Sequence, residues 1–203
     1  MSVKTAIIGL GIMGRRMAEH MSLHSEYELS GLWDPNAEAC KATQSILPGA
    51  PIMATPEDAI SDAELVYLAC PPVPRKAYAI LAASAGKAVF LEKPLSVDIA
   101  ESKALVAHLD ACGVPAAVNF TQAAGTALTE VSRAALDGAM GNVLGADIVV
   151  TYPAWPRVWQ KPADWLRFRA EGGDDARSNF ALLVLFRTRP GAVVSRFCPA
   201  VLS

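Results

Sequence analysis

The sequence predicts an α/β protein, with a Rossmann-type doubly wound parallel sheet followed by an incomplete α+β second domain. Short apolar runs alternate with amphipathic segments from residue 3 to about residue 120. This alternation is typical of repeated strand–helix–strand units. A glycine-rich turn joins the first apolar run to the first amphipathic segment. The alternation stops near residue 119, so we expect one domain over residues 1–119 and a partial second domain over residues 120–203.

Apolar runs of this length, bounded by turn residues, are typical of parallel strands that are buried on both faces. The expected strands are Val3–Ile8, Tyr27–Trp33, Ile52–Met53, Leu65–Ala69, Ala88–Leu91 and Ala116–Phe120. The expected helices are Ile12–Leu23, Asn36–Leu47, a short helix that opens at Thr55, Pro74–Ala85, Ser96–Cys112 and Ala123–Leu136. A long strand-like run, Val143–Tyr152, follows the last of these helices.

The composition excludes several classes of partner. The 203 residues include 18 basic and 20 acidic side chains, which give a formal net charge of −2. Without a basic excess, neither nucleic acid nor an anionic membrane is an expected partner. No apolar run reaches the ~18 residues that a membrane span needs. The four cysteines are widely spaced and form no CxxC pair, so we expect reduced thiols, no metal site and a cytoplasmic location.

The glycine-rich turn reads Gly9-Leu-Gly11-Ile-Met-Gly14, which is the GxGxxG spacing. Gly9 permits a tight turn, Gly11 lets the backbone approach a pyrophosphate, and Gly14 lets the helix pack closely on the strand. The first helical residues, Ile12 and Met13, offer free N–H groups and a partial positive charge to phosphates. The pattern therefore predicts a dinucleotide-binding loop formed by all five of these residues.

Asp34 lies at the end of the second expected strand, 20 residues after Gly14. A carboxylate in this place accepts hydrogen bonds from the adenosine ribose hydroxyls and repels a 2′-phosphate, so it favours NAD(H) over NADP(H). Two alternatives stay open: a glycine turn without a ligand, and an S-adenosylmethionine methyltransferase, which also combines a glycine-rich first loop with an acid after the second strand. The third glycine favours the dinucleotide.

Near the fifth expected strand the chain reads Gly86-Lys-Ala-Val-Phe-Leu-Glu92-Lys93-Pro94. This resembles the GKHVLxEKP signature of the glucose–fructose oxidoreductase / inositol dehydrogenase (Gfo/Idh/MocA) family. The Cys70–Pro72 segment is similar to the family's Thr-Pro turn, and Gly138–Val143 is similar to the GxIGxV that starts its second domain. Gly172-Gly173 resembles the start of its GGG segment.

The resemblance implies hydride transfer between a nicotinamide and a hydroxyl-bearing carbon of a sugar, cyclitol or related polyol. It implies that Lys93 is the catalytic residue that exchanges a proton with the reacting oxygen, although a lysine after a strand is often only a surface residue. Arg75 stands where the family often has a histidine near the nicotinamide. The residues that the resemblance places at the cofactor are Cys70, Pro71, Pro72, Glu92, Lys93, Pro94 and Asn119.

The sequence departs from the family after about residue 173. The family has an acid and then a histidine there, and the only histidines of this chain are His20, His24 and His108. Full-length relatives usually form homo-oligomers through an open sheet, of which this chain has about one strand. We therefore expect a truncated or frame-shifted dehydrogenase of this family, and the alternative is a catalytically inactive nucleotide-binding remnant.

Overall fold

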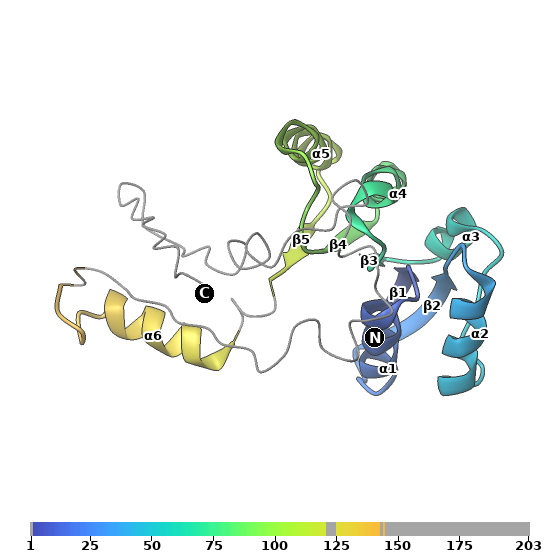
Figure 1. The fold of residues 1–203 in the computed structure, drawn as a ribbon, viewed down its shortest axis with the longest axis horizontal. Coiled ribbons are helices and arrows are strands. Elements are labelled where there is room, and N and C mark those ends of the chain that lie inside the picture. Colours follow the sequence, from blue (N-terminus) through green and yellow to red (C-terminus); the bar gives the residue numbers. More distant parts are fainter. Residues whose placement is uncertain (1, 121–124, 143, 145–203) are drawn as a thin grey trace, which may run out of the picture.

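The computed structural model describes residues 2–120, 125–142 and 144. In this part of the chain five parallel strands form one sheet in the order β2-β1-β3-β4-β5 (Figure 1). The strands are β1 (Val3–Ile8), β2 (Tyr27–Trp33), β3 (Leu65–Leu68), β4 (Ala88–Glu92) and β5 (Ala116–Asn119). The predicted Rossmann-type sheet is confirmed.

The six described helices are α1 (Ile12–Ser22), α2 (Ala37–Ile46), α3 (Pro56–Ser61), α4 (Pro72–Ser84), α5 (Ile99–Cys112) and α6 (Thr126–Leu136). Side-chain caps begin three of them, because Asn36, Thr55 and Asp98 accept hydrogen bonds from N–H groups of the first turn. Gly113 ends α5 with a φ of 66°. No helix in these ranges is both long enough and apolar enough to cross a membrane.

Helices cover both faces of the sheet, and each face has its own core. Helices α3, α4 and α5 pack on one face, where α4 and α5 lie side by side (Figure 1). Helix α1 packs on the other face, with Ala18 and Met21 against Ile7, Leu32 and Tyr67. Burial of apolar surface in these two layers is the main stabilising term, at roughly 25 cal/mol per Å².

Ile52–Met53 is not a strand. Ile52 forms a single parallel bridge with Leu32, flanked by hydrogen bonds from Leu32 N–H to the Pro51 carbonyl and from Met53 N–H to the Leu32 carbonyl. The pairing stays this short because Pro51 has no N–H to donate and the cap of α3 begins at Thr55.

Two helices begin at other residues than the sequence predicts. Helix α5 begins at Ile99, not Ser96, because the Asp98 side chain accepts from Glu101 N–H at 2.9 Å and caps the helix. Helix α4 begins at Pro72 rather than Pro74. Proline is suited to the first position of a helix, because N–H groups of the first turn have no hydrogen-bond partner within the helix. The other bounds agree with the expectation or shift by one residue. The start of the helix expected at Ala123 and the run 143–152 lie outside the described residues.

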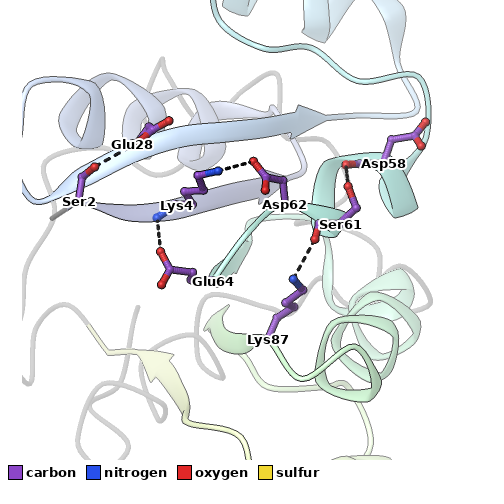
Figure 2. A network of polar contacts seen from close by, with 8 residues as sticks. All are labelled: Ser2, Lys4, Glu28, Asp58, Ser61, Asp62, Glu64 and Lys87. Carbon is purple, nitrogen blue, oxygen red and sulfur yellow. Dashed lines mark hydrogen bonds and ion pairs between the residues drawn. The ribbon is translucent and has the colours of Figure 1, made fainter.

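The amino ends and the carboxyl ends of the strands differ in what lies there. At the amino ends of the strands, exposed polar side chains tie the elements together (Figure 2). Lys4 Nζ contacts Asp62 at 2.7 Å, and Lys87 Nζ donates to the Ser61 carbonyl at 2.9 Å. The strand order reverses between β1 and β3, so the binding crevice expected of such a sheet lies at the opposite, carboxyl edge of these two strands.

Candidate cofactor site

Two glycines of the GxGxxG pattern leave no room for a side chain, one in the loop between β1 and α1 and one in the first turn of α1. Gly9 has a φ of 96°, and a Cβ there would lie 2.5 Å from the backbone nitrogen of Cys70. A Cβ on Gly14 would lie 1.8 Å from the carbonyl oxygen of Gly9. Gly9 therefore lets the glycine loop pack against the loop that follows β3, and Gly14 lets α1 pack against the backbone of Gly9.

Gly11 differs from the other two glycines of the motif. A Cβ at Gly11 would meet no atom within 4 Å, so the space in front of it is open. Gly11 is also the N-cap of α1, without a side-chain cap hydrogen bond and without an acidic residue in the first turn of the helix. The N–H groups at Ile12 and Met13 are therefore offered to a ligand, and a pyrophosphate fits this uncapped, locally positive helix end.

Asp34 joins the end of β2 to this loop. Its Oδ2 accepts a hydrogen bond from Leu10 N–H at 2.6 Å, and its Oδ1 accepts one from Asn36 N–H at 2.8 Å. The half-buried carboxylate is thereby held beside the glycine loop, at the place where a dinucleotide's adenosine ribose is expected. Both oxygens retain further lone pairs for ribose hydroxyls.

The turn after β3 packs against the glycine loop. Cys70 is buried, and burial raises the pKa of its thiol to about 11, so the side chain is neutral at ordinary pH. Pro71 and Pro72 follow as the N-cap and first residue of α4. The turn thus presents a rigid, uncharged surface to the crevice.

A buried polar cluster lies under the end of β4. The hydroxyl of Tyr67, from β3, donates to Glu92 Oε1, and the amide of Asn119, from β5, donates to the same oxygen at 2.6 Å. Burial and the negative charge of Glu92 raise the pKa of the Tyr67 hydroxyl, which keeps it a hydrogen-bond donor. The cluster ties three neighbouring strands together where they end.

Arg75 has a role that the sequence analysis did not predict. It lies in the first turns of α4, within the expected helix, and its side chain is only 1% exposed. Its guanidinium donates to the backbone carbonyls of Cys70, Glu92 and Pro94. A side chain that is enclosed in this way cannot contact a nicotinamide.

Lys93 follows directly after β4 and is exposed. The peptide bond that joins it to Pro94 is cis. In the described part of the chain its ammonium has no hydrogen-bond or ion-pair partner. Its position at the carboxyl end of a parallel strand, two strands from the glycine loop, suits a group that reacts at the edge of the crevice.

The structure brings the glycine loop, Asp34 and the Cys70 turn together, and it places Glu92, Lys93, Pro94 and Asn119 at neighbouring strand ends. Sequence reasoning missed Tyr67 and the internal role of Arg75. Tyr67 could have been suspected, because a tyrosine in an otherwise aliphatic buried strand needs a partner for its hydroxyl. The Gly172–Gly173 segment lies outside the described residues.

Comparison with known proteins matches the same part of the chain. Residues 3–120 fit the model of an oxidoreductase family with an NAD-binding Rossmann fold, Gfo/Idh/MocA. An inositol 2-dehydrogenase of Cereibacter sphaeroides is 31% identical over 117 residues, which are 56% of this chain and 34% of that protein. An uncharacterized oxidoreductase of Streptococcus pneumoniae is 33% identical over 113 residues, 54% of this chain and 29% of that protein.

A solved structure agrees with these relatives. The WlbA dehydrogenase of Bordetella pertussis, in complex with NADH and UDP-GlcNAcA, superposes with a TM-score of 0.64 at 26% identity, over 70% of this chain and 41% of that one. The chain thus spans about a third of the length of the curated relatives it matches. Because the family model covers more than half of the chain, the protein belongs to the Gfo/Idh/MocA oxidoreductase family, whose members have an NAD-binding Rossmann fold.

Proposed function

We propose that this chain binds NAD(H) and is the cofactor-binding part of a dehydrogenase. The dehydrogenase would move a hydride between the nicotinamide and a hydroxyl-bearing carbon of a sugar, cyclitol or related polyol. One observation carries the proposal: the open, uncapped N-terminus of α1 at Gly11 lies beside the Asp34 carboxylate, which is held on Leu10. An inositol dehydrogenase and a dehydrogenase with bound NADH among its relatives support the same chemistry.

Asp34 supports NAD(H) rather than NADP(H). The carboxylate is held on the backbone by two N–H groups and cannot turn away easily. A 2′-phosphate on the ribose would bring at least one further negative charge against it, whereas two ribose hydroxyls would donate to it. The positive end of α1 would hold the pyrophosphate of either cofactor, so the discrimination depends on Asp34.

Lys93 is the residue that we propose for proton transfer. When bound, the nicotinamide supplies or accepts the hydride. As the hydroxyl-bearing carbon loses its hydride, the hydroxyl loses its proton to the Lys93 amine and a carbonyl results. In the reverse direction the Lys93 ammonium returns the proton to the oxygen. The rigid turn around Lys93 would limit the positions from which its flexible stem approaches the substrate.

The first experiment is a fluorescence titration of the full chain with NADH and NADPH. We expect NADH to bind at least about tenfold more tightly, as the repulsion at Asp34 requires. Equal affinities would remove the basis for the NAD(H) assignment, and a lack of binding to either cofactor would refute the proposed function.

The second experiment tests Lys93 with inositols and other polyols as substrates. Lys93→Ala should lower kcat by about 10²–10⁴-fold, the usual contribution of general acid–base catalysis. The Kd of NADH should remain near that of the wild type. Lys103→Ala, which removes an exposed lysine from α5, is the matched control. Unchanged turnover in Lys93→Ala would make Lys93 a surface residue only.

The redox compartment is a further part of the proposal. The three cysteines in the described ranges, Cys40, Cys70 and Cys112, are all free thiols. Free thiols support a reducing compartment, and we propose a cytoplasmic location on that basis.

A further inference from the structure

The guanidinium of Arg75 is surrounded by backbone. Its Nε and Nη2 donate to the Cys70 carbonyl at 3.1 and 2.6 Å, and its Nη1 donates to the carbonyls of Glu92 and Pro94. With 1% of its surface exposed, Arg75 is the largest fully buried side chain in the described ranges. A single side chain of α4 therefore holds the loop after β3 and the loop after β4 at once.

This use of a charged side chain is uncommon. Buried arginines usually pair with a carboxylate in a bidentate fork, because the desolvated charge needs an opposite charge. Here every N–H in the described contacts goes to a carbonyl oxygen, and the Glu92 carboxylate supports the charge without a hydrogen bond. Burial lowers the pKa of Arg75, and the negative field of Glu92 opposes that change. The guanidinium therefore donates its hydrogen bonds to the backbone and holds the path of the two loops.

The two carbonyls that share Nη1 flank one residue, Lys93. The side chain before it is fixed as well, because Glu92 accepts hydrogen bonds from Tyr67 and Asn119. The backbone on both sides of Lys93 is held from within the domain, while the Lys93 side chain itself points to solvent. This arrangement fixes the backbone position of Lys93 and leaves its side-chain amine exposed.

We propose that Arg75 is the positioning residue of Lys93: by holding the carbonyls of Glu92 and Pro94 together with that of Cys70, it fixes the turn from which Lys93 reaches the cofactor crevice. The role rests on the proposed function of Lys93. It requires a planar fork whose donors point in several directions, which a lysine does not have. Arg75→Lys should therefore restore the buried charge without restoring the geometry.

The first test needs no cofactor. Hydrogen exchange measured by mass spectrometry should show the segment Leu91–Leu95 exchanging at least about tenfold faster in Arg75→Met than in the wild type, because the hydrogen bonds of a charged donor are lost. The segment Val3–Ile8, at the centre of the sheet, should keep its rate. Lys76→Met is the matched control, since it removes a cation of the same helix that, within the described ranges, pairs with Glu101 alone at 3.0 Å.

Arg75→Lys decides the question if Arg75→Met does not fold. Its single ammonium cannot reach both loops, so Leu91–Leu95 should still exchange faster than in the wild type while the melting temperature stays close to that of the control variant. A wild-type rate in this segment would overturn the proposal. So would an equal acceleration in Val3–Ile8, because it would mean that Arg75 stabilises the domain as a whole.

The second test measures the consequence at Lys93. Saturating NADH should slow the acetylation of Lys93 by acetic anhydride in the wild type, because the bound cofactor covers the amine. In Arg75→Lys the Kd of NADH should stay within about threefold of the wild-type value, since the glycine loop and Asp34 are untouched, but most of the protection of Lys93 should be lost. Full protection in the variant would overturn the positioning role.

The two tests separate the two proposals. If wild-type chain does not bind NADH, the proposed function fails, and the exchange of Leu91–Leu95 still decides whether Arg75 holds the turn. If NADH binds and protects Lys93 equally in wild type and variant, the proposed function stands and the role of Arg75 is refuted.

Discussion

The carboxylate of Asp34 accepts a hydrogen bond from the backbone N–H of Leu10 at 2.6 Å, so the end of β2 holds the glycine loop that follows β1. The residue that we propose for the ribose therefore also holds the loop that we propose for the pyrophosphate. One side chain couples the two parts of the proposed dinucleotide site, and a change at Asp34 should affect both.

Asp34→Ala should consequently weaken NADH binding more than the loss of ribose contacts alone would. We expect the Kd of NADH to rise by about 10–100-fold, because the contacts of a charged acceptor are each worth about 1.5–3 kcal/mol. The preference over NADPH should shrink, since the repelling charge is gone. Calorimetric titration of both cofactors measures the two effects. Asp62→Ala at the opposite edge of the sheet (Figure 2) is the control and should leave both affinities unchanged.

Gly11→Ala should separate cofactor binding from folding. The new methyl group meets no protein atom, so the unfolding free energy should fall by about 1 kcal/mol or less, the usual cost of alanine at an N-cap. The same methyl group would occupy the space open to the pyrophosphate, and NADH affinity should fall by at least about tenfold. Urea denaturation and fluorescence titration give the two numbers.

Gly14→Ala should have the opposite signature. Its Cβ would lie 1.8 Å from the Gly9 carbonyl oxygen, so α1 must move away from the loop. We expect a loss of about 2–4 kcal/mol in unfolding free energy, as in overpacked cores. A Gly14→Ala protein with wild-type stability would contradict the packing described here.

Removing the hydroxyl of Tyr67 should cost stability at the strand ends. In Tyr67→Phe the buried Glu92 carboxylate loses one of its donors, and a hydrogen bond to a charged group is worth about 1.5–3 kcal/mol. Tyr78→Phe is the matched control, because the Tyr78 ring packs edge-on against Trp33 and its hydroxyl has no hydrogen bond in the described residues. Denaturation curves of equal midpoint for the two variants would show that the Tyr67–Glu92 contact contributes nothing.

Stability should fall in alkaline solution. The unfolded chain releases the Cys70 proton near the ordinary thiol pKa of 9.0, whereas the folded chain holds it up to a pKa of about 11. The folded state therefore binds more protons between these values, so its stabilisation is complete below pH 9 and decreases by on the order of 2 kcal/mol as the pH rises to 11.

The raised pKa of Tyr67 acts in the same direction, so the variant Cys70→Ala is needed to isolate the thiol. Thermal melts from pH 7 to pH 11 should show a shallower decrease in this variant than in the wild type. Identical slopes would mean that the Cys70 thiol is not the titrating group.

Apart from Ile52–Met53, the sequence by itself determined the succession of strands and helices along the described chain, together with the glycine loop and the acid after β2. These features follow from local rules: strand and helix periodicity, cap residues, and a motif whose parts lie within 26 residues of one another. The start of α5 is an exception: the sequence predicts a helix from Ser96, whereas the Asp98 side chain caps the helix, because polar residues close together in the sequence can each begin one.

Only the tertiary structure decided what Arg75, Tyr67 and Glu92 do. Their partners lie between 5 and 27 residues away and come together only when β3, β4 and β5 align in parallel. The sequence shows that a charged residue is present. The surroundings of that residue in the folded protein decide whether its N–H groups contact a ligand or the backbone. Helix α4 places the Arg75 side chain inside the domain. A buried guanidinium is costly unless its N–H groups are hydrogen-bonded, so Arg75 donates to the backbone carbonyls around it.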